Sequence, residues 1–153
     1  MSIVTFYRND PNAPKTTMPA RLGANAIIRR GDTLLLERRR DSDTWGLVGG
    51  GVKKWEEPID AIVRETYEEL GLRIAKEKFR KLAVYGEPGR IAAYRDGSIW
   101  RMVVVVFEVE IPENATVRIS DESKELRFFT KEEIGQIDIV VTHSDIVDDW
   151  FVK

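Results

Sequence analysis

The sequence predicts an α+β fold with a mixed β-sheet, and three features lead to this prediction. Several short apolar segments have the length and composition of β-strands. Segment 58–70 has apolar residues at helical spacing, and shorter helices are expected at 131–135 and 144–152. The run 102–107, Met-Val-Val-Val-Val-Phe, is apolar on both faces, so it is expected at the centre of the sheet.

The remaining elements follow from local signals along the chain. Residues 1–19 are polar and contain three prolines, so they are predicted to form an extended lead-in before a domain at 20–153. Within the lead-in, 3–7 is either an edge strand or an arm that binds a partner. Strands are expected at 24–28, 33–36, 45–48, 81–85, 100–111 and 126–129, the first two joined as a hairpin by Arg30-Gly31-Asp32.

The helix at 58–70 carries clear signals at both ends. Pro58 suits the first turn, and Gly71 suits the left-handed residue that ends a helix, with Leu72 as its apolar cover. One stripe of this helix is expected to face the core, formed by Ile59, Ile62, Val63, Thr66 and Leu70.

Composition limits the classes of function. The chain has 153 residues, enough for one domain with a real core, and a net charge of −2, which argues against binding a nucleic-acid polymer. It has no cysteine, which excludes disulfides and thiol catalysis. Its longest apolar run is far too short to span a membrane. We therefore expect a soluble, cytoplasmic protein with a small-molecule ligand, without a nucleic-acid or membrane partner.

Three glutamates on the predicted helix are the most informative residues. At ~100° per residue, Glu65, Glu68 and Glu69 fall within roughly one third of the helix circumference. Glu68 and Glu69 also lie in the last turn, where the helix dipole disfavours anions. A solvated acidic face is the common explanation of such a helix. A hard divalent cation with oxygen ligands would instead remove the repulsion.

The residues around this helix distinguish the two explanations. Gly50 is followed after five residues by Glu56, then after seven by Arg64-Glu65, after two by Glu68-Glu69, and after one by Gly71-Leu72. This pattern resembles the signature of the Nudix hydrolase superfamily, which implies a Nudix fold: an α/β/α sandwich around a mixed sheet. The departures are Val48, Trp55 and Thr66, where the family usually has Pro, Gly and an aliphatic residue. None of them removes a carboxylate.

The resemblance implies a Mg²⁺-dependent hydrolase, with Mn²⁺ able to substitute, that cleaves a pyrophosphate bond in a nucleoside diphosphate linked to another group. Glu68 and Glu69 would be metal ligands, and Glu65 would be a ligand or the general base. An alternative is a nucleotide-binding regulator that has lost catalysis, and another is a structural cation-binding domain. The substrate is left open among nucleoside triphosphates, ADP-ribose-like compounds, nucleotide sugars and dinucleoside polyphosphates.

Further site residues are also implied by the resemblance. The backbone carbonyl of Gly49 would be a metal ligand, Arg64 would orient the adjacent glutamate, and Glu56 would contribute to the metal or water network. A loop glutamate completes the site in some members, and Glu122 fits that role, acting on the metal or as the base. Glu125 is the reserve candidate.

Several other residues remain open. His143 is predicted just before the last helix, where a neutral histidine is unremarkable. A base could stack on Trp45, Tyr85, Tyr94 or Trp100, and substrate phosphates could bind residues 38–40, Arg21, Arg90, Arg95 or Arg101. A homodimer is slightly favoured because 3–7 could pair with a second copy.

Overall fold

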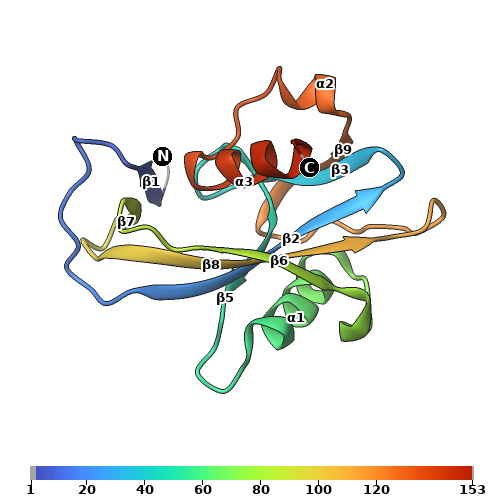
Figure 1. The fold of residues 1–153 in the computed structure, drawn as a ribbon, viewed down its shortest axis with the longest axis horizontal. Coiled ribbons are helices and arrows are strands. Elements are labelled where there is room, and N and C mark those ends of the chain that lie inside the picture. The colour runs from blue at the N-terminus through green and yellow to red at the C-terminus, as the bar shows by residue number, and fades with distance from the viewer. Residues whose placement is uncertain (1–2, 153) are drawn as a thin grey trace.

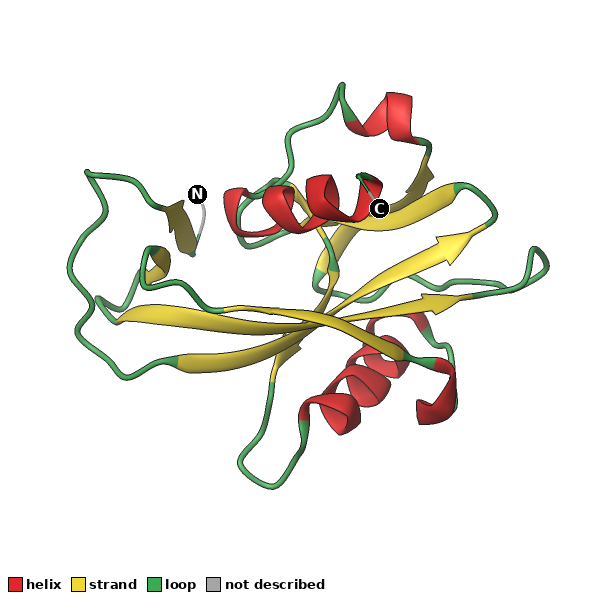
Figure 2. Cartoon of the chain, in the orientation of Figure 1, coloured by secondary structure: helices red, strands yellow, loops and turns green. Residues whose placement is uncertain are grey.

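The computed structural model describes residues 3–152. Figure 1 shows its elements, and Figure 2 separates helices from strands by colour. The strands are β1 (Val4–Arg8), β2 (Arg21–Arg30), β3 (Thr33–Arg39), β4 (Trp45–Gly46), β5 (Val48–Gly51), β6 (Arg80–Tyr85), β7 (Arg90–Tyr94), β8 (Ile99–Glu110) and β9 (Ser123–Phe129). The helices are α1 (Pro58–Leu70), α2 (Lys131–Ile134) and α3 (Val141–Phe151), with a short 3₁₀ turn, η1 (Lys76–Lys78).

The sheet is mixed, as predicted. Its main path runs β1-β7-β8-β2-β3-β4, with β5 against β2, β6 against β8 and β9 against β3. The β2–β8 pair is parallel, whereas the other pairs are antiparallel. The apolar run 102–107 lies in β8, which pairs with three strands, so its central position is confirmed.

Helices cover the sheet on two sides. In Figure 1, α1 lies below the sheet, whereas α2 and α3 lie above it. Side chains alternate along β3: Leu35 packs with Ile62 of α1, while Leu34 and Leu36 pack with Ile146 of α3. The α+β sandwich is therefore confirmed.

Helix α1 has the bounds that the sequence predicts. Pro58 begins it, a capping box between Glu57 and Asp60 satisfies its first turn, and Gly71 ends it in the left-handed conformation at φ 73°. Thr66 is fully buried, and its hydroxyl donates a hydrogen bond to the Ile62 carbonyl at 2.6 Å. The polar atom of this unusual residue is thus satisfied within the helix, and its methyl group faces the core.

The N-terminal segment forms a strand within its own chain. β1 pairs with β7, which the sequence analysis did not predict. β7 is only five residues long, and glycines on either side of it, Gly89 and Gly97, are typical of loops. The pairing places β1 beside the pockets described below. Pairing of this segment with a second copy remains a prediction.

The last helix begins earlier than predicted. α3 starts at Val141, and its N-cap Val140 offers no side-chain hydrogen bond. Ser144 has the stronger cap signal in the sequence, and this is why the predicted start was wrong. His143 consequently lies inside the first turn of α3 rather than before the helix. None of the helices within residues 3–152 has the length and apolar character needed to cross a membrane.

Candidate active site

An acidic pocket of about 370 Å³ opens where β3, β5, α1 and the loop before β9 meet. Its lining includes Glu65 and Glu69 from α1, Gly49 from β5, and Glu122 from the loop. The structure therefore brings together four of the five predicted metal-site residues. The fifth, Glu68, is not among the residues that line this pocket. Its side chain is about half exposed and contacts Arg64 at 2.9 Å.

Two glycines of β5 allow the strand to lie against the acidic residues. Gly49 has φ 149°, and a Cβ there would lie 2.1 Å from the Ala24 carbonyl oxygen. A Cβ on Gly50 would lie 2.5 Å from Oε1 of Glu65. The Gly49 amide donates a hydrogen bond to Glu69 at 3.4 Å. Any other residue at either position would displace the strand or a carboxylate.

Arg64 joins the glycine strand to three glutamates. Its guanidinium contacts Glu56 at 2.7 Å and both Glu65 and Glu68 at 2.9 Å, and donates to the Gly51 carbonyl at 3.0 Å. The hydrogen bond from Arg64 lowers the pKa of Glu56 to about 2, so Glu56 is a fixed anion. This geometry is compatible with the orienting role predicted for Arg64. Glu56 contacts the guanidinium of Arg64 and is not among the residues that line the pocket.

Glu37 is an acidic residue of the pocket that the sequence analysis missed. It lies on β3, is 5% exposed, and accepts a 2.7 Å hydrogen bond from Ser123. A sequence signal was available, because Glu37 follows Leu35 on the face of β3 that meets α1. A charged residue on the buried face of a core strand is unusual.

Glu37 and Glu69 line the same pocket, and both side chains are almost completely buried. Burial raises the pKa of Glu69, and the negative charges of Glu37 and Glu65 raise it further. Burial also raises the pKa of Glu37. Two adjacent buried carboxylates need either a proton or a cation between them. The donors are all oxygen atoms, which suits Mg²⁺ or Mn²⁺ better than Zn²⁺.

The pocket residues suit a divalent cation because their donors are oxygen atoms and their side chains are acidic. Within residues 3–152, no three Asp, Glu, His or Cys side chains already stand in the arrangement that a metal ion requires. Glu122 is exposed in the loop that ends at β9, while Glu125 lies on β9 and pairs with Arg127 at 2.8 Å. Of these two candidates, Glu122 is the one that faces the pocket.

A second, smaller pocket of about 100 Å³ shares Arg39 and the three glycines of β5 with the acidic pocket. Phe6, Asn25, Tyr94 and His143 are also in its lining. The Leu47 amide donates to Nδ1 of His143 at 3.0 Å. Burial, reinforced by Arg39 and Arg90, lowers the pKa of His143 to about 3, so its ring is neutral at physiological pH.

The structure separates the candidate arginines and aromatic residues. Arg39 lines both pockets, and Arg21 lies over the rings of Tyr94 and Trp100 at 5.5 and 5.7 Å. Others serve structural contacts: Arg38 pairs with Asp43, Arg101 donates to the Gly86 carbonyl, Trp45 packs on Phe129, and Tyr85 donates to Asp149.

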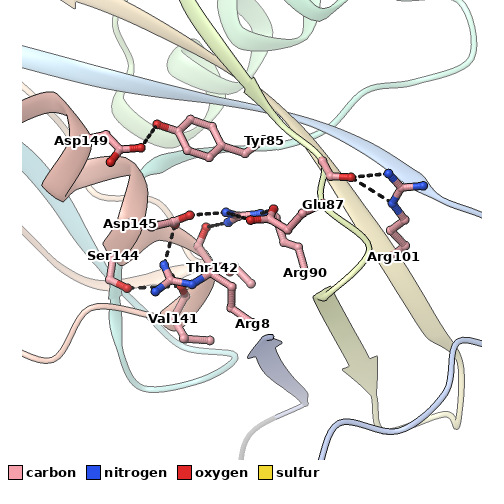
Figure 3. Close-up of polar contacts among 11 residues, drawn as sticks. Arg8, Tyr85, Glu87, Arg90, Arg101, Val141, Thr142, Ser144, Asp145 and Asp149 are labelled. Carbon is pink, nitrogen blue, oxygen red and sulfur yellow. Dashed lines mark hydrogen bonds and ion pairs between the residues drawn. The ribbon is translucent and has the colours of Figure 1, made fainter. Parts of the chain in front are cut away.

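Arg90 belongs to a buried network that anchors α3 (Figure 3). Its guanidinium contacts Glu87 at 2.7 Å, pairs with Asp145 and donates to the Thr142 carbonyl. Arg8 of β1 pairs with the same Asp145 at 3.0 Å. The network fixes the first turns of α3 against β1 and β7, so Arg90 is not available to a substrate phosphate.

Comparison with known proteins identifies the family. The NUDIX domain profile matches residues 19–151. The chain belongs to the Nudix family. It is 29% identical over 113 residues to a MutT-like protein from Streptomyces ambofaciens, covering 74% of this chain and 65% of that protein. It thus spans less than two thirds of this relative. It is also 28% identical over 99 residues to nucleoside triphosphatase NudI from Escherichia fergusonii. That match covers 63% of this chain and 69% of NudI.

A solved structure shares this fold. A bifunctional NMN adenylyltransferase/ADP ribose pyrophosphatase from Francisella tularensis, complexed with AMP and a Mn ion, superposes with a TM-score of 0.72. The two chains are 20% identical, and the match covers 91% of this chain and 42% of that one. The predicted family is therefore confirmed, while the roles of individual site residues remain predictions.

Proposed function

We propose that this Nudix protein is a Mg²⁺- or Mn²⁺-dependent hydrolase that cleaves a pyrophosphate bond in a nucleoside diphosphate linked to another group. One observation carries the proposal: an acidic pocket and a smaller, partly aromatic pocket meet at Gly49–Gly51 and Arg39. A diphosphate placed in the first pocket would leave its nucleoside beside the second. The relative named as a nucleoside triphosphatase supports this substrate class.

The acidic residues would bind the cation or accept a proton, according to their positions in the pocket. Glu65, Glu69 and Glu122 would hold the cation, with the Gly49 carbonyl and, after a side-chain rotation, Glu68. When bound, the cation neutralises phosphate oxygens and lowers the pKa of water. Glu122 would take the proton of the attacking water.

Two cationic residues would position the substrate. The Nε and Nη2 atoms of Arg39 donate hydrogen bonds to the Asp41 carboxylate at 2.9 and 2.6 Å. These bonds fix the guanidinium beside both pockets. It would bind a phosphate oxygen there. Arg21, held over Tyr94 and Trp100, would face the nucleoside side of the same glycine strand.

A substrate panel tests this function. The purified protein would be incubated with Mg²⁺, Mn²⁺, Ca²⁺ or EDTA and with nucleoside triphosphates, ADP-ribose, nucleotide sugars and dinucleoside polyphosphates, while released phosphate or nucleoside monophosphate is measured. We expect turnover with Mg²⁺ and Mn²⁺, little with the larger Ca²⁺, and none in EDTA. Nucleotide binding without turnover would instead identify a regulator, and equal turnover in EDTA would refute the cation requirement.

A further inference from the structure

Glu37 lies outside the signature that identifies the family but faces the same pocket as Glu65, Glu69 and Glu122. It comes from β3 and not from α1, so it approaches the glutamates of the helix from the sheet. It lines this pocket together with Glu69, and the negative charge of Glu37 raises the pKa of Glu69. Besides these three glutamates, the pocket lining therefore includes an acidic side chain that is almost completely buried.

A second contact connects Glu37 to the loop that carries Glu122. The Ser123 hydroxyl, itself fully buried, donates to Glu37 at 2.7 Å. Ser123 is the first residue of β9 and directly follows Glu122. The pairing of β3 with β9 shifts register here, since Arg38 lies opposite Glu125 and Arg39 opposite Ser123. The hydrogen bond thus holds the irregular start of β9, and with it the loop that carries Glu122.

A purely structural acceptor for one serine hydroxyl would not need a charge. An amide would accept the same hydrogen bond without the cost of burying a carboxylate beside Glu69. Arg39, whose charge also acts on Glu37, directs two of its nitrogens to Asp41. The negative charge of Glu37 is therefore left facing the pocket, where a divalent cation would stabilise it.

We propose that Glu37 is a functional carboxylate of this pocket. Its charge strengthens divalent-cation binding beside Glu69, and its hydrogen bond with Ser123 makes it a positioning residue for Glu122. This inference rests on the proposed cation-dependent function. It extends the site by a residue that the family signature does not contain.

Two variants of the full chain separate charge from hydrogen bonding. Glu37→Gln keeps an acceptor for Ser123 and offers its amide to Glu69, but it removes the charge. We expect Mn²⁺ affinity, measured by electron paramagnetic resonance, to fall about 10- to 100-fold. The melting temperature in EDTA should rise, because the buried pair no longer has to take up a proton when the cation is absent. Glu132→Gln, on the exposed first turn of α2, is the matched control and should change neither quantity.

Ser123→Ala keeps the charge of Glu37 and removes the hydrogen bond. We expect Mn²⁺ affinity close to that of the wild type, with kcat lowered about 10-fold and KM unchanged, because Glu122 is held less well. Unchanged Mn²⁺ affinity in Glu37→Gln would overturn the cation role, and unchanged kcat in Ser123→Ala would overturn the positioning role. Either of these results could be obtained with an unmodified protein that is active, so neither would refute the proposed function. That function would be refuted if the wild-type protein neither bound Mn²⁺ nor hydrolysed nucleotides.

Discussion

Two groups of charged side chains, one beside α1 and one beside α3, differ in charge balance: the charges are balanced only in the second. Beside α3, Arg8 and Arg90 face Glu87 and Asp145, so two cations meet two anions. This group needs nothing from outside the chain. It holds a helix against the sheet, and its charges are satisfied by one another.

Beside α1 the anions are in excess. Glu37 and Glu69 are nearly fully buried and adjacent, while the cation of the signature, Arg64, is directed to Glu56, Glu65 and Glu68. Folding alone does not select such an arrangement, because each buried carboxylate costs free energy. The excess of buried anions beside α1 is therefore the basis for the cation proposed there, whereas the balanced group beside α3 is explained by the packing of α3 alone.

The largest expected effect is at Glu69. Glu69→Gln preserves shape and helix propensity but removes one anion from the unbalanced group, so cation-dependent turnover should fall by orders of magnitude. The melting temperature in EDTA should hold or rise, because the buried pair then needs neither a proton nor a cation between its two members. Steady-state kinetics and thermal unfolding of the same preparation measure both. Near-wild-type activity would remove Glu69 from the site, and a large loss of stability would mean that its charge is structural.

Glu122 tests whether the loop contributes to the acidic group. Glu122→Gln should lower the maximal rate by ~10²–10⁴-fold at saturating Mg²⁺, as expected for a carboxylate acting on water. Glu125→Gln should have little effect, because that side chain pairs with Arg127 along β9. If both variants turn over normally, catalysis depends on the helix glutamates alone.

The balanced group should respond in the opposite way. Arg90→Met leaves Glu87 and Asp145 without their buried partner, which should destabilise the fold by about 3 kcal/mol, the low end for a broken buried pair, because both acids keep some solvent contact. Lys124→Met breaks an exposed pair with Asp43 and should cost less than ~1 kcal/mol. Urea unfolding measures both. Equal losses in the two variants would contradict the structural role of the network.

The sequence predicted α1, its ends and the position of β8 because local signals and burial agree there. Pro58, Gly71 and the apolar stripe of α1 are all read within one segment. Glu37 was missed because its significance depends on Glu69, and the two come together only through the pairing of strands with α1. Strand β7 was missed because it is only five residues long and one of its partners, β1, lies far along the chain. Local patterns contain no information about such contacts.

His143 was predicted outside the last helix because Ser144 has the stronger cap signal, and it gives the smallest expected effect. Its Nδ1 accepts a hydrogen bond from the Leu47 amide, so the folded protein needs the neutral ring. Because the pKa of His143 is about 3 when folded and ~6.5 when unfolded, the unfolded chain binds more protons between these values. The stability that the neutral ring contributes is present above pH ~6.5 and is lost as the pH falls toward 3.

The loss should be measurable between pH 7.5 and 5.0. At ~1.4 kcal/mol per pH unit below 6.5, His143 should cost about 2 kcal/mol of unfolding free energy by pH 5.0. His143→Asn is the matched variant, since its amide oxygen can accept from Leu47 without titrating. Urea unfolding at both pH values should therefore show the wild type losing about 2 kcal/mol more than the variant. Equal losses would mean that the folded protein tolerates a charged His143, and that the second pocket is more open to water than its burial indicates.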